Sequence, residues 1–306
     1  MTAGARQRGG GDFPRRRFLA AAGAVALAGC AGLPATSPAR ASGLASVNGT
    51  RLYYETAGAG EPVVLLHAFT LDARMWDEHF DALAARYRVI RYDARGFGRS
   101  DVPRAGEPYS HADDLAALLE RLGERDAHVV GASMGARFAV DLALVRPARV
   151  RSLALLGAVV GGWPWSRQWL ESYAPVVRAA RAGDVAAAKR AWLAHEIFAP
   201  AREQPALAAR LERMVADYSG WHFLNADPER TVAPAAVSQL GRVRAPTLVV
   251  VGERDLPDFR LMAERVARGV ADARQVAIAR AGHLAGMEAP ARVRELLEAF
   301  LGAQAT

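Results

Sequence analysis

The sequence predicts an α/β protein with a largely parallel central sheet, and three observations carry the prediction. Short apolar runs of strand type alternate with longer helical patterns along most of the chain after residue 43, which indicates β-α-β units. Several runs are continuously apolar, as at residues 62–66, which is typical of strands covered on both faces. A serine flanked by glycines joins one strand pattern to the helix that follows it. A chain of 306 residues can hold one such domain with a sizeable insertion.

The individual elements follow from periodicity and turn residues. Asn48-Gly49 stands between two alternating segments, 44–47 and 50–56, and predicts a hairpin. Further strands are expected at 62–66, 88–92, 128–130, 151–156, 247–251 and 274–279. Helices are expected at 75–85, 110–122, 136–145, 259–270 and 290–301. Because parallel sheets carry their sites at the carboxyl ends of the strands, we look for function in the loops that follow them.

The serine lies in Gly131-Ala132-Ser133-Met134-Gly135, the form of a chain that turns abruptly from strand to helix. The serine backbone is strained in such a turn, and a Cβ two residues away on either side would collide with neighbouring elements. The first free N–H groups of the new helix then point at the serine oxygen, where negative charge develops. With 28 glycines in the chain, this motif alone is only suggestive.

The positive charge of the chain is concentrated at its N-terminus. Of the formal net charge of +7, residues 1–41 hold six arginines and one aspartate, or +5, which leaves +2 for the remainder. Basic and acidic residues are interspersed in that remainder. A nearly neutral globular part gives no reason to expect a nucleic acid as partner.

Residues 1–41 predict an export signal and linker. Arg15-Arg16-Arg17 precedes a short Ala/Gly-rich apolar run, which resembles a twin-arginine signal and is too short for a membrane span. The run ends in Leu-Ala-Gly-Cys30, which resembles a lipobox with an acylated cysteine; the alternative is cleavage at Ala39-Arg40-Ala41. Cys30 is the single cysteine of the chain, so no intramolecular disulfide is possible. We expect an exported bacterial protein, anchored to the membrane through lipid on Cys30 or else periplasmic or secreted, with a flexible linker over 31–43.

Four more motifs accompany the serine turn, each after a predicted strand. They are Leu-Leu-His-x-Phe at 65–69, Asp-x-Arg-Gly-x-Gly-x-Ser at 93–100, Val-Gly-Glu-Arg-Asp at 251–255 and Ala-Gly-His at 281–283. Together with Gly-Ala-Ser-Met-Gly, and in this order, they resemble the α/β-hydrolase family over essentially all of residues 43–306. The resemblance implies an enzyme without a cofactor. The most similar members are esterases, enol-lactonases, C–C bond hydrolases and perhydrolases or haloperoxidases.

The resemblance implies a Ser-His-Asp triad. Ser133 would be the nucleophile, because a serine hydroxyl attacks only when a base takes its proton. Of the seven histidines, His283 matches the family's base, while His67 corresponds to a loop histidine that shapes backbone. Asp255 follows a late strand where the family keeps the acid that orients the imidazole, and Asp258 is the runner-up.

Two backbone N–H groups are implied as an oxyanion hole, those of Met134 and Phe69. The family usually has glycine after the loop histidine, and this chain has Ala68, which makes the Phe69 donor less secure than that of Met134. Asp93, Arg95 and Arg99 also match family positions, and we interpret them as structural ion pairs that hold a loop.

The strand–helix alternation stops between residues 160 and 235, where helical patterns such as 169–182 and 185–198 take over. The resemblance implies a helical cap there, inserted into a core of residues 42–159 and 236–306. Five of the six tryptophans lie in this segment, and we expect Trp163, Trp165 and Trp192 to line a substrate pocket. With few charges nearby, the segment favours a small apolar or aromatic substrate.

The sequence thus predicts a serine hydrolase that cleaves a small ester or lactone through an acyl-enzyme. C–C bond hydrolysis and peracid or haloperoxidase chemistry use the same residues and stay open as alternatives. A ligand-binding protein without catalysis on the same scaffold is the outside alternative. No His, Cys or Glu spacing suggests a metal site, and no Gly-x-Gly-x-x-Gly follows a strand, so neither a metal nor a cofactor is expected.

Overall fold

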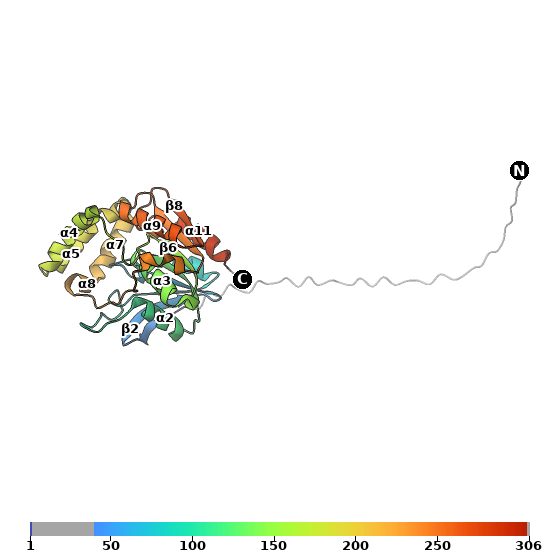
Figure 1. The fold of residues 1–306 in the computed structure, drawn as a ribbon, viewed down its shortest axis with the longest axis horizontal. Helices are drawn as coiled ribbons and strands as arrows, with labels where there is room; N and C mark the ends of the chain where they lie inside the picture. The colour runs from blue at the N-terminus through green and yellow to red at the C-terminus, as the bar shows by residue number, and fades with distance from the viewer. Residues whose placement is uncertain (2–39, 305–306) are drawn as a thin grey trace, which may run out of the picture. The chain divides into compact units, whose positions relative to one another are not determined.

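The computed structural model describes Met1 and residues 40–304 of the chain. The predicted export signal, with Cys30, lies outside these residues and stays a prediction. Residues 40–304 form eight strands (Figure 1), namely β1 (Ala41–Val47), β2 (Thr50–Ala57), β3 (Pro62–Leu66), β4 (Arg88–Tyr92), β5 (Ala127–Ala132), β6 (Val150–Leu156), β7 (Thr247–Gly252) and β8 (Ala273–Ile278). Each predicted strand is present, and its ends differ from the prediction by no more than three residues.

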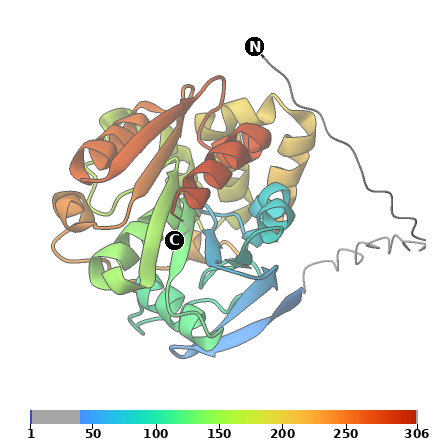
Figure 2. The same cartoon turned by 90° about the vertical axis from the view of Figure 1, so that its right-hand side faces the viewer.

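The strands form one sheet in the order β1-β2-β4-β3-β5-β6-β7-β8. β2 is antiparallel to both of its neighbours, and all other adjacent strands are parallel. In Figure 2 the blue hairpin of β1 and β2 lies at one edge of the sheet and the orange-red β8 at the other. The prediction of a largely parallel sheet is confirmed.

The first strand begins earlier than predicted. Residues 41–43 were expected in the linker, but β1 starts at Ala41, which pairs with Thr56 of β2. Ala, Ser and Gly have a low strand propensity, so the sequence carries no strand signal there, and pairing with β2 extends the strand. The predicted turn is present, since Asn48 and Gly49 have φ values of 46° and 72°, as this hairpin turn requires.

The sheet separates two hydrophobic cores, and successive residues of each strand alternate between them. In β3, for example, Val63 and Leu65 belong to one core, whereas Val64 and Leu66 belong to the other. Helices α1 (Asp77–Ala84) and α11 (Pro290–Gly302) pack on the first core, and α2 (His111–Arg121) and α3 (Met134–Val145) pack on the second. Both faces are therefore covered, which explains why the strands are continuously apolar. Helices α9 (Pro257–Gly269) and α10 (Ala285–Glu288) follow β7 and β8.

A group of helices separates β6 from β7, where the strand–helix alternation stops. They are α4 (Arg167–Arg181), α5 (Val185–Ala194), α6 (Ala199–Arg202), α7 (Pro205–Asp217) and α8 (Trp221–Leu224); Figure 1 labels four of them at one end of the sheet-centred body. We call these the inserted helices. Their buried residues, such as Val176, Leu211 and Met214, continue the first core. None of the helices within residues 40–304 combines the length and apolar character needed to cross a bilayer.

Candidate active site

Ser133 stands at the turn between β5 and α3 with a strained backbone, φ 52° and ψ −111°. The two glycines of the motif make this turn possible. A Cβ on Gly131 would lie 2.4 Å from the carbonyl oxygen of Gly135, and a Cβ on Gly135 would lie 2.4 Å from that of Leu66 in β3. Any side chain at either position would therefore displace the helix from the sheet. The strain leaves the serine hydroxyl at the carboxyl end of the parallel strands.

The structure brings Ser133, His283 and Asp255 together from three separate loops. The Ser133 hydroxyl lies 2.8 Å from Nε2 of His283, and Nδ1 of His283 lies 3.0 Å and 3.2 Å from the two carboxylate oxygens of Asp255. Since a carboxylate only accepts hydrogen bonds, Nδ1 carries the imidazole hydrogen, and Nε2 is left to accept the hydrogen of the serine. All three side chains are buried. The arrangement can thus pass a proton from the serine to the imidazole while the carboxylate stabilises the imidazolium.

Small residues and one carboxylate fix the loop that carries His283. Gly157, after β6, has φ 54°, and a Cβ there would lie 2.7 Å from the carbonyl oxygen of His283. The carboxylate of Glu288 accepts hydrogen bonds from the backbone N–H groups of Gly282 and Leu284, on either side of the histidine. Burial raises the pKa of Glu288. The imidazole is therefore held through its own backbone as well as through Asp255.

Met134 and Phe69, whose backbone N–H groups are the implied oxyanion donors, both line the cavity that contains Ser133. Neither N–H group has a hydrogen-bond acceptor within residues 40–304. His67 orients the second of them, because its Nδ1 lies 2.8 Å from the carbonyl oxygen of Ala68 while its Nε2 accepts from the N–H of Ala94. In a trans peptide the N–H points opposite to the C=O, so the N–H of Phe69 points away from His67. Both ring nitrogens of His67 are thus engaged with backbone, as the resemblance implies.

Asp258 and Trp163 lie together, apart from the serine. The indole N–H of Trp163 donates to Oδ1 of Asp258 at 3.0 Å, and the backbone N–H and hydroxyl of Ser166 also donate to this carboxylate. These bonds lower the pKa of Asp258 against the opposing effect of burial. Asp258 therefore anchors the start of α4. Trp163, which we expected in the pocket, does not belong to the cavity lining, because its indole turns to this carboxylate instead.

The predicted ion pairs around the loop 93–100 are present. Asp93 accepts from the backbone and guanidinium N–H groups of Arg99 at 2.9 Å and 3.0 Å, and it also accepts from the N–H of Ala73. Arg95 forms a double hydrogen bond with Asp114, both distances being 2.8 Å. These contacts hold the loop beside the site.

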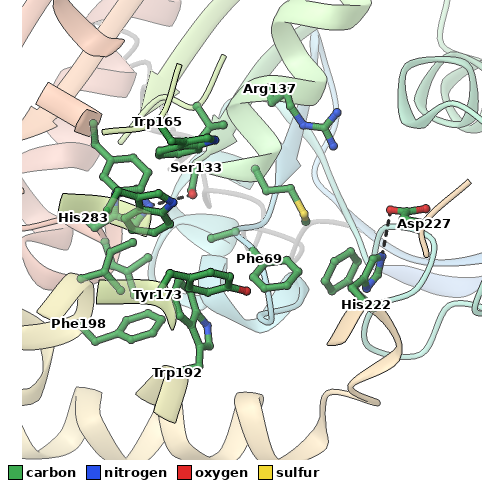
Figure 3. Close-up of a pocket in the computed structure, with 18 of the residues that line it drawn as sticks. Phe69, Ser133, Arg137, Trp165, Tyr173, Trp192, Phe198, His222, Asp227 and His283 are labelled. Atoms are coloured by element: carbon green, nitrogen blue, oxygen red, sulfur yellow. Dashed lines mark hydrogen bonds and ion pairs between the residues drawn. The ribbon is translucent and has the colours of Figure 1, made fainter. Parts of the chain in front are cut away.

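A cavity of about 260 Å³ opens over Ser133, between the sheet and the inserted helices (Figure 3). Of the predicted tryptophans, Trp165 and Trp192 line it. The sequence reasoning missed several further aromatic residues of the lining, namely Trp169, Tyr173, Phe198 and Phe259. Trp169 and Tyr173 are four residues apart on α4, and their rings stack at 5.7 Å, so helical spacing could have identified them.

The far end of the same cavity is polar, which the sequence did not indicate. It is formed by His111, Arg137, His222, Asp227 and Glu229. The guanidinium of Arg137 donates to both carboxylate oxygens of Glu229, at 2.9 Å and 2.7 Å. Burial lowers the pKa of His111 well below its ordinary value and lowers that of His222 to about 4. Beside these histidines, the polar end carries one guanidinium and two carboxyl groups. Within residues 40–304, no cluster of His, Cys, Asp or Glu is arranged to hold a metal ion.

Comparison with known protein families identifies the class of protein to which this fold and the residues at its strand ends belong. Residues 61–290 match the family of the alpha/beta hydrolase fold. The chain belongs to this family, and it is an α/β-hydrolase enzyme.

Relatives named for different hydrolytic activities are similar in sequence to this protein over most of its length. It is 32% identical to a putative carbamate hydrolase of Azorhizobium caulinodans, covering 82% of this chain and 95% of the relative. It is 31% identical to a 2-hydroxy-6-oxononadienedioate/2-hydroxy-6-oxononatrienedioate hydrolase of Paraburkholderia phymatum, covering 82% and 91%. Among solved structures, an N-acyl homoserine lactone degrading enzyme, Est816, superimposes with a TM-score of 0.67 and 29% identity, over 84% of this chain and all of that one.

Proposed function

We propose that this protein is a serine hydrolase that cleaves a small ester or lactone through an acyl-enzyme. One observation carries the proposal: the Ser133 hydroxyl, on a strained turn, lies 2.8 Å from Nε2 of His283, whose other nitrogen faces the buried carboxylate of Asp255. This is the geometry of a nucleophile, a general base and the acid that orients the base.

In the first half of the proposed reaction, His283 takes the hydroxyl proton as Ser133 attacks the carbonyl carbon. Nε2 then returns this proton to the oxygen of the leaving alcohol as the ester bond breaks, which leaves an acyl group on the serine. In the second half, water loses a proton to His283, attacks the acyl carbon and releases the acid, and the proton returns to the serine. In a lactone, the leaving alcohol stays attached to the acyl group.

The oxyanion of each tetrahedral intermediate would be held by the backbone N–H groups of Met134 and Phe69. Met134 begins α3, so its N–H is one of the free donors of the helix N-terminus. A donor of this kind contributes about a hundredfold or more to the rate. The methyl group of Ala68 is buried. The peptide that bears the Phe69 N–H is held through its carbonyl oxygen by His67, which favours Phe69 as the second donor despite the missing glycine.

The aromatic walls support an apolar or aromatic acyl group. Trp165, Tyr173 and Trp192 lie around the space beside Ser133 in Figure 3, and Trp169 also belongs to the lining. The faces of these rings favour flat or branched apolar groups. One structural relative is named as an enzyme that degrades N-acyl homoserine lactones, which are lactones with an acyl chain. Ester and lactone cleavage require the same residues.

The test is turnover of a panel of p-nitrophenyl esters, from acetate to octanoate with benzoate, by the full chain. We expect turnover, and we expect Ser133→Ala to lower kcat by at least about a thousandfold. The matched control is Ser46→Ala, since Ser46 is exposed on β1 and does not belong to the cavity lining. Folded protein that cleaves no member of the panel, or Ser133→Ala with unchanged kcat, would contradict the proposal.

C–C bond hydrolysis is the second candidate, because one relative is named as the hydrolase of a dienedioate. Such a substrate carries two carboxylates. The cavity lining contains a single guanidinium, that of Arg137. Both of its terminal nitrogens already donate hydrogen bonds to the carboxylate of Glu229. We therefore expect that the purified protein does not cleave a dienedioate. Cleavage would be measured as a loss of the substrate's visible absorbance.

A further inference from the structure

The cavity has two chemically different ends. Near Ser133 its wall is aromatic, and at the far end it is formed by polar residues of α3, α8 and the segment after α8. The ring of Phe69 stands between the ends: it contacts Trp192 and His222 edge to face, with ring centroids 6.0 Å apart in each case. In Figure 3, Trp192 and Phe198 lie on one side of Phe69, and His222 and Asp227 lie on the other.

The positive charge at the polar end is already neutralised. Arg137 donates two hydrogen bonds to Glu229, and Asp141 lies 3.6 Å from the same guanidinium. The Arg137 side chain is 16% exposed and that of Glu229 is 10% exposed, so this pair is desolvated and strong. Arg137 therefore has no free charge to offer a ligand carboxylate.

The carboxylate of Asp227, by contrast, has no cation beside it. One of its oxygens accepts the backbone N–H of Glu229, and the other lies 3.7 Å from Nε2 of His222. Within residues 40–304, no lysine or arginine forms an ion pair with Asp227. The Asp227 side chain keeps 30% of its surface exposed, and it belongs to the cavity lining, so a ligand can reach it.

The histidine beside Asp227 is neutral. The hydroxyl oxygen of Tyr218 accepts the backbone N–H of His222 and lies 2.8 Å from its Nδ1. Since Nε2 faces the Asp227 carboxylate, which only accepts hydrogen bonds, we assign the ring hydrogen of His222 to Nε2, and Nδ1 then accepts the hydroxyl hydrogen of Tyr218. Burial holds the pKa of His222 at about 4, so at neutral pH the ring contributes a dipole and no positive charge.

We propose that the polar end of the cavity binds a protonated amine of the substrate at Asp227. The substrate would then be an ester or lactone with an apolar or aromatic group beside Ser133 and an ammonium group at the opposite end. This inference rests on the proposed function and narrows its substrate class. An ammonium group suits this position because it donates hydrogen bonds only, and the Asp227 carboxylate can accept them. The same carboxylate repels a ligand carboxylate.

The kinetic test compares three benzoate esters in which the alcohol ends in an amine, a methyl or a carboxylate group, with linkers of three to six carbons. We expect the best amino ester to exceed the methyl ester of equal length by about tenfold in kcat/KM, and the carboxylate ester to be the poorest. The preference should weaken at high salt. In Asp227→Asn the ratio of amino to methyl ester should fall to within about twofold of one.

The matched control is Glu212→Gln, which removes the same charge from an exposed position on α7 and should keep the wild-type ratio. Equal kcat/KM for amino and methyl esters in the wild type, or an unchanged ratio in Asp227→Asn, would overturn the proposal.

A binding measurement separates this proposal from the proposed function. The benzamide analogues of the amino and methyl esters are bound to the Ser133→Ala protein and compared by calorimetry. We expect about tenfold tighter binding of the amino benzamide, and loss of that difference when Asp227→Asn is added. Equal affinities would overturn the amine site whatever the esterase assay shows, whereas selective binding without any turnover would overturn the serine hydrolase alone.

Discussion

Two backbone N–H groups on either side of His283 share one carboxylate, that of Glu288. Glu288 itself does not line the cavity, and its carboxylate bonds only to the backbone on either side of His283, so it acts through the position of the imidazole. The distance from Nε2 to the serine hydroxyl is 2.8 Å, and rates of oriented reactions fall steeply with small displacements. In the proposed mechanism, Glu288 is therefore a positioning residue for His283.

Glu288→Gln leaves one acceptor oxygen and turns the other into an NH₂ donor that faces a backbone N–H. We expect kcat on a p-nitrophenyl ester to fall by about tenfold or more. KM should change less than twofold, because no residue that lines the cavity is substituted. Glu295→Gln, at an exposed position on α11, should keep both constants. A rise in KM with unchanged kcat would show that Glu288 shapes binding and not the base.

Among individual residues, those in short loop motifs could be predicted from the sequence. Ser133, Asp255 and His283 each follow a strand within a short recognisable pattern, so the sheet topology alone brings them together. Trp163 was predicted to line the pocket, but its indole N–H donates a hydrogen bond to Asp258, and this one contact decides the direction of the side chain. Asp227 could not be found, since its position depends on how the segment after α8 folds over the cavity, and no local periodicity encodes that.

Among the elements, the inserted helix α5 is bonded directly to the loop after β3. The indole N–H of Trp192 donates to the hydroxyl of Thr70 at 2.8 Å, and that hydroxyl donates to the carbonyl oxygen of Phe69 at 2.6 Å. Thr70 has φ 62°, a left-handed conformation that a β-branched residue rarely adopts. The bond from Trp192 thus helps to hold the loop that presents the Phe69 N–H.

Trp192→Phe keeps an aromatic ring and removes the donor, together with the second ring of the indole. We expect the free energy of unfolding to fall by about 1 kcal/mol, and kcat to fall by about threefold to tenfold as the loop loses its brace. Trp169→Phe is the control, because Trp169 also lines the cavity but its indole N–H makes no hydrogen bond within residues 40–304. If both substitutions lowered kcat equally, ring size and not the hydrogen bond would be responsible.

The strands were easier to predict than the inserted helices. Strands buried on both faces are continuous apolar runs, bounded by turn residues, as in β3 and β7. Helix α7 was not assigned, although Leu207, Leu211 and Met214 recur at helical spacing and are buried. Short helices such as α6, α8 and α10 have four residues each, too few for a periodic signal.

Buried histidines are a property of the molecule as a whole. Burial lowers the pKa of six of them below the ordinary value, namely His67, His79, His111, His128, His195 and His222. Between the unfolded pKa of about 6.5 and the lower folded pKa, the unfolded chain binds more protons than the folded one. Stability must therefore fall as the pH falls through this range. Asp141, with a pKa raised to about 6, opposes the trend.

We expect the free energy of unfolding, measured with urea, to be several kcal/mol lower at pH 5 than at pH 7. For His222, whose folded pKa is about 4, the contribution to this loss is about 2 kcal/mol. His222→Asn should shrink the difference between pH 7 and pH 5 by about that amount, whatever its effect at pH 7. An unchanged difference would show that His222 is not buried in its neutral form.

The export signal and the lipid on Cys30 stay predictions from the sequence. Labelling bacteria that express the protein or its Cys30→Ser variant with a radioactive fatty acid would test the lipid attachment.

The most direct test of the account is to find where the acyl group is attached. The full chain is mixed rapidly with a p-nitrophenyl ester, quenched in acid, digested with trypsin and measured by mass spectrometry. We predict an acyl adduct on the peptide 126–137, which contains Ser133, absent in Ser133→Ala and formed far more slowly in His283→Ala. Turnover without an adduct on that peptide, or an adduct on another residue, would contradict the assignment of Ser133 as the nucleophile.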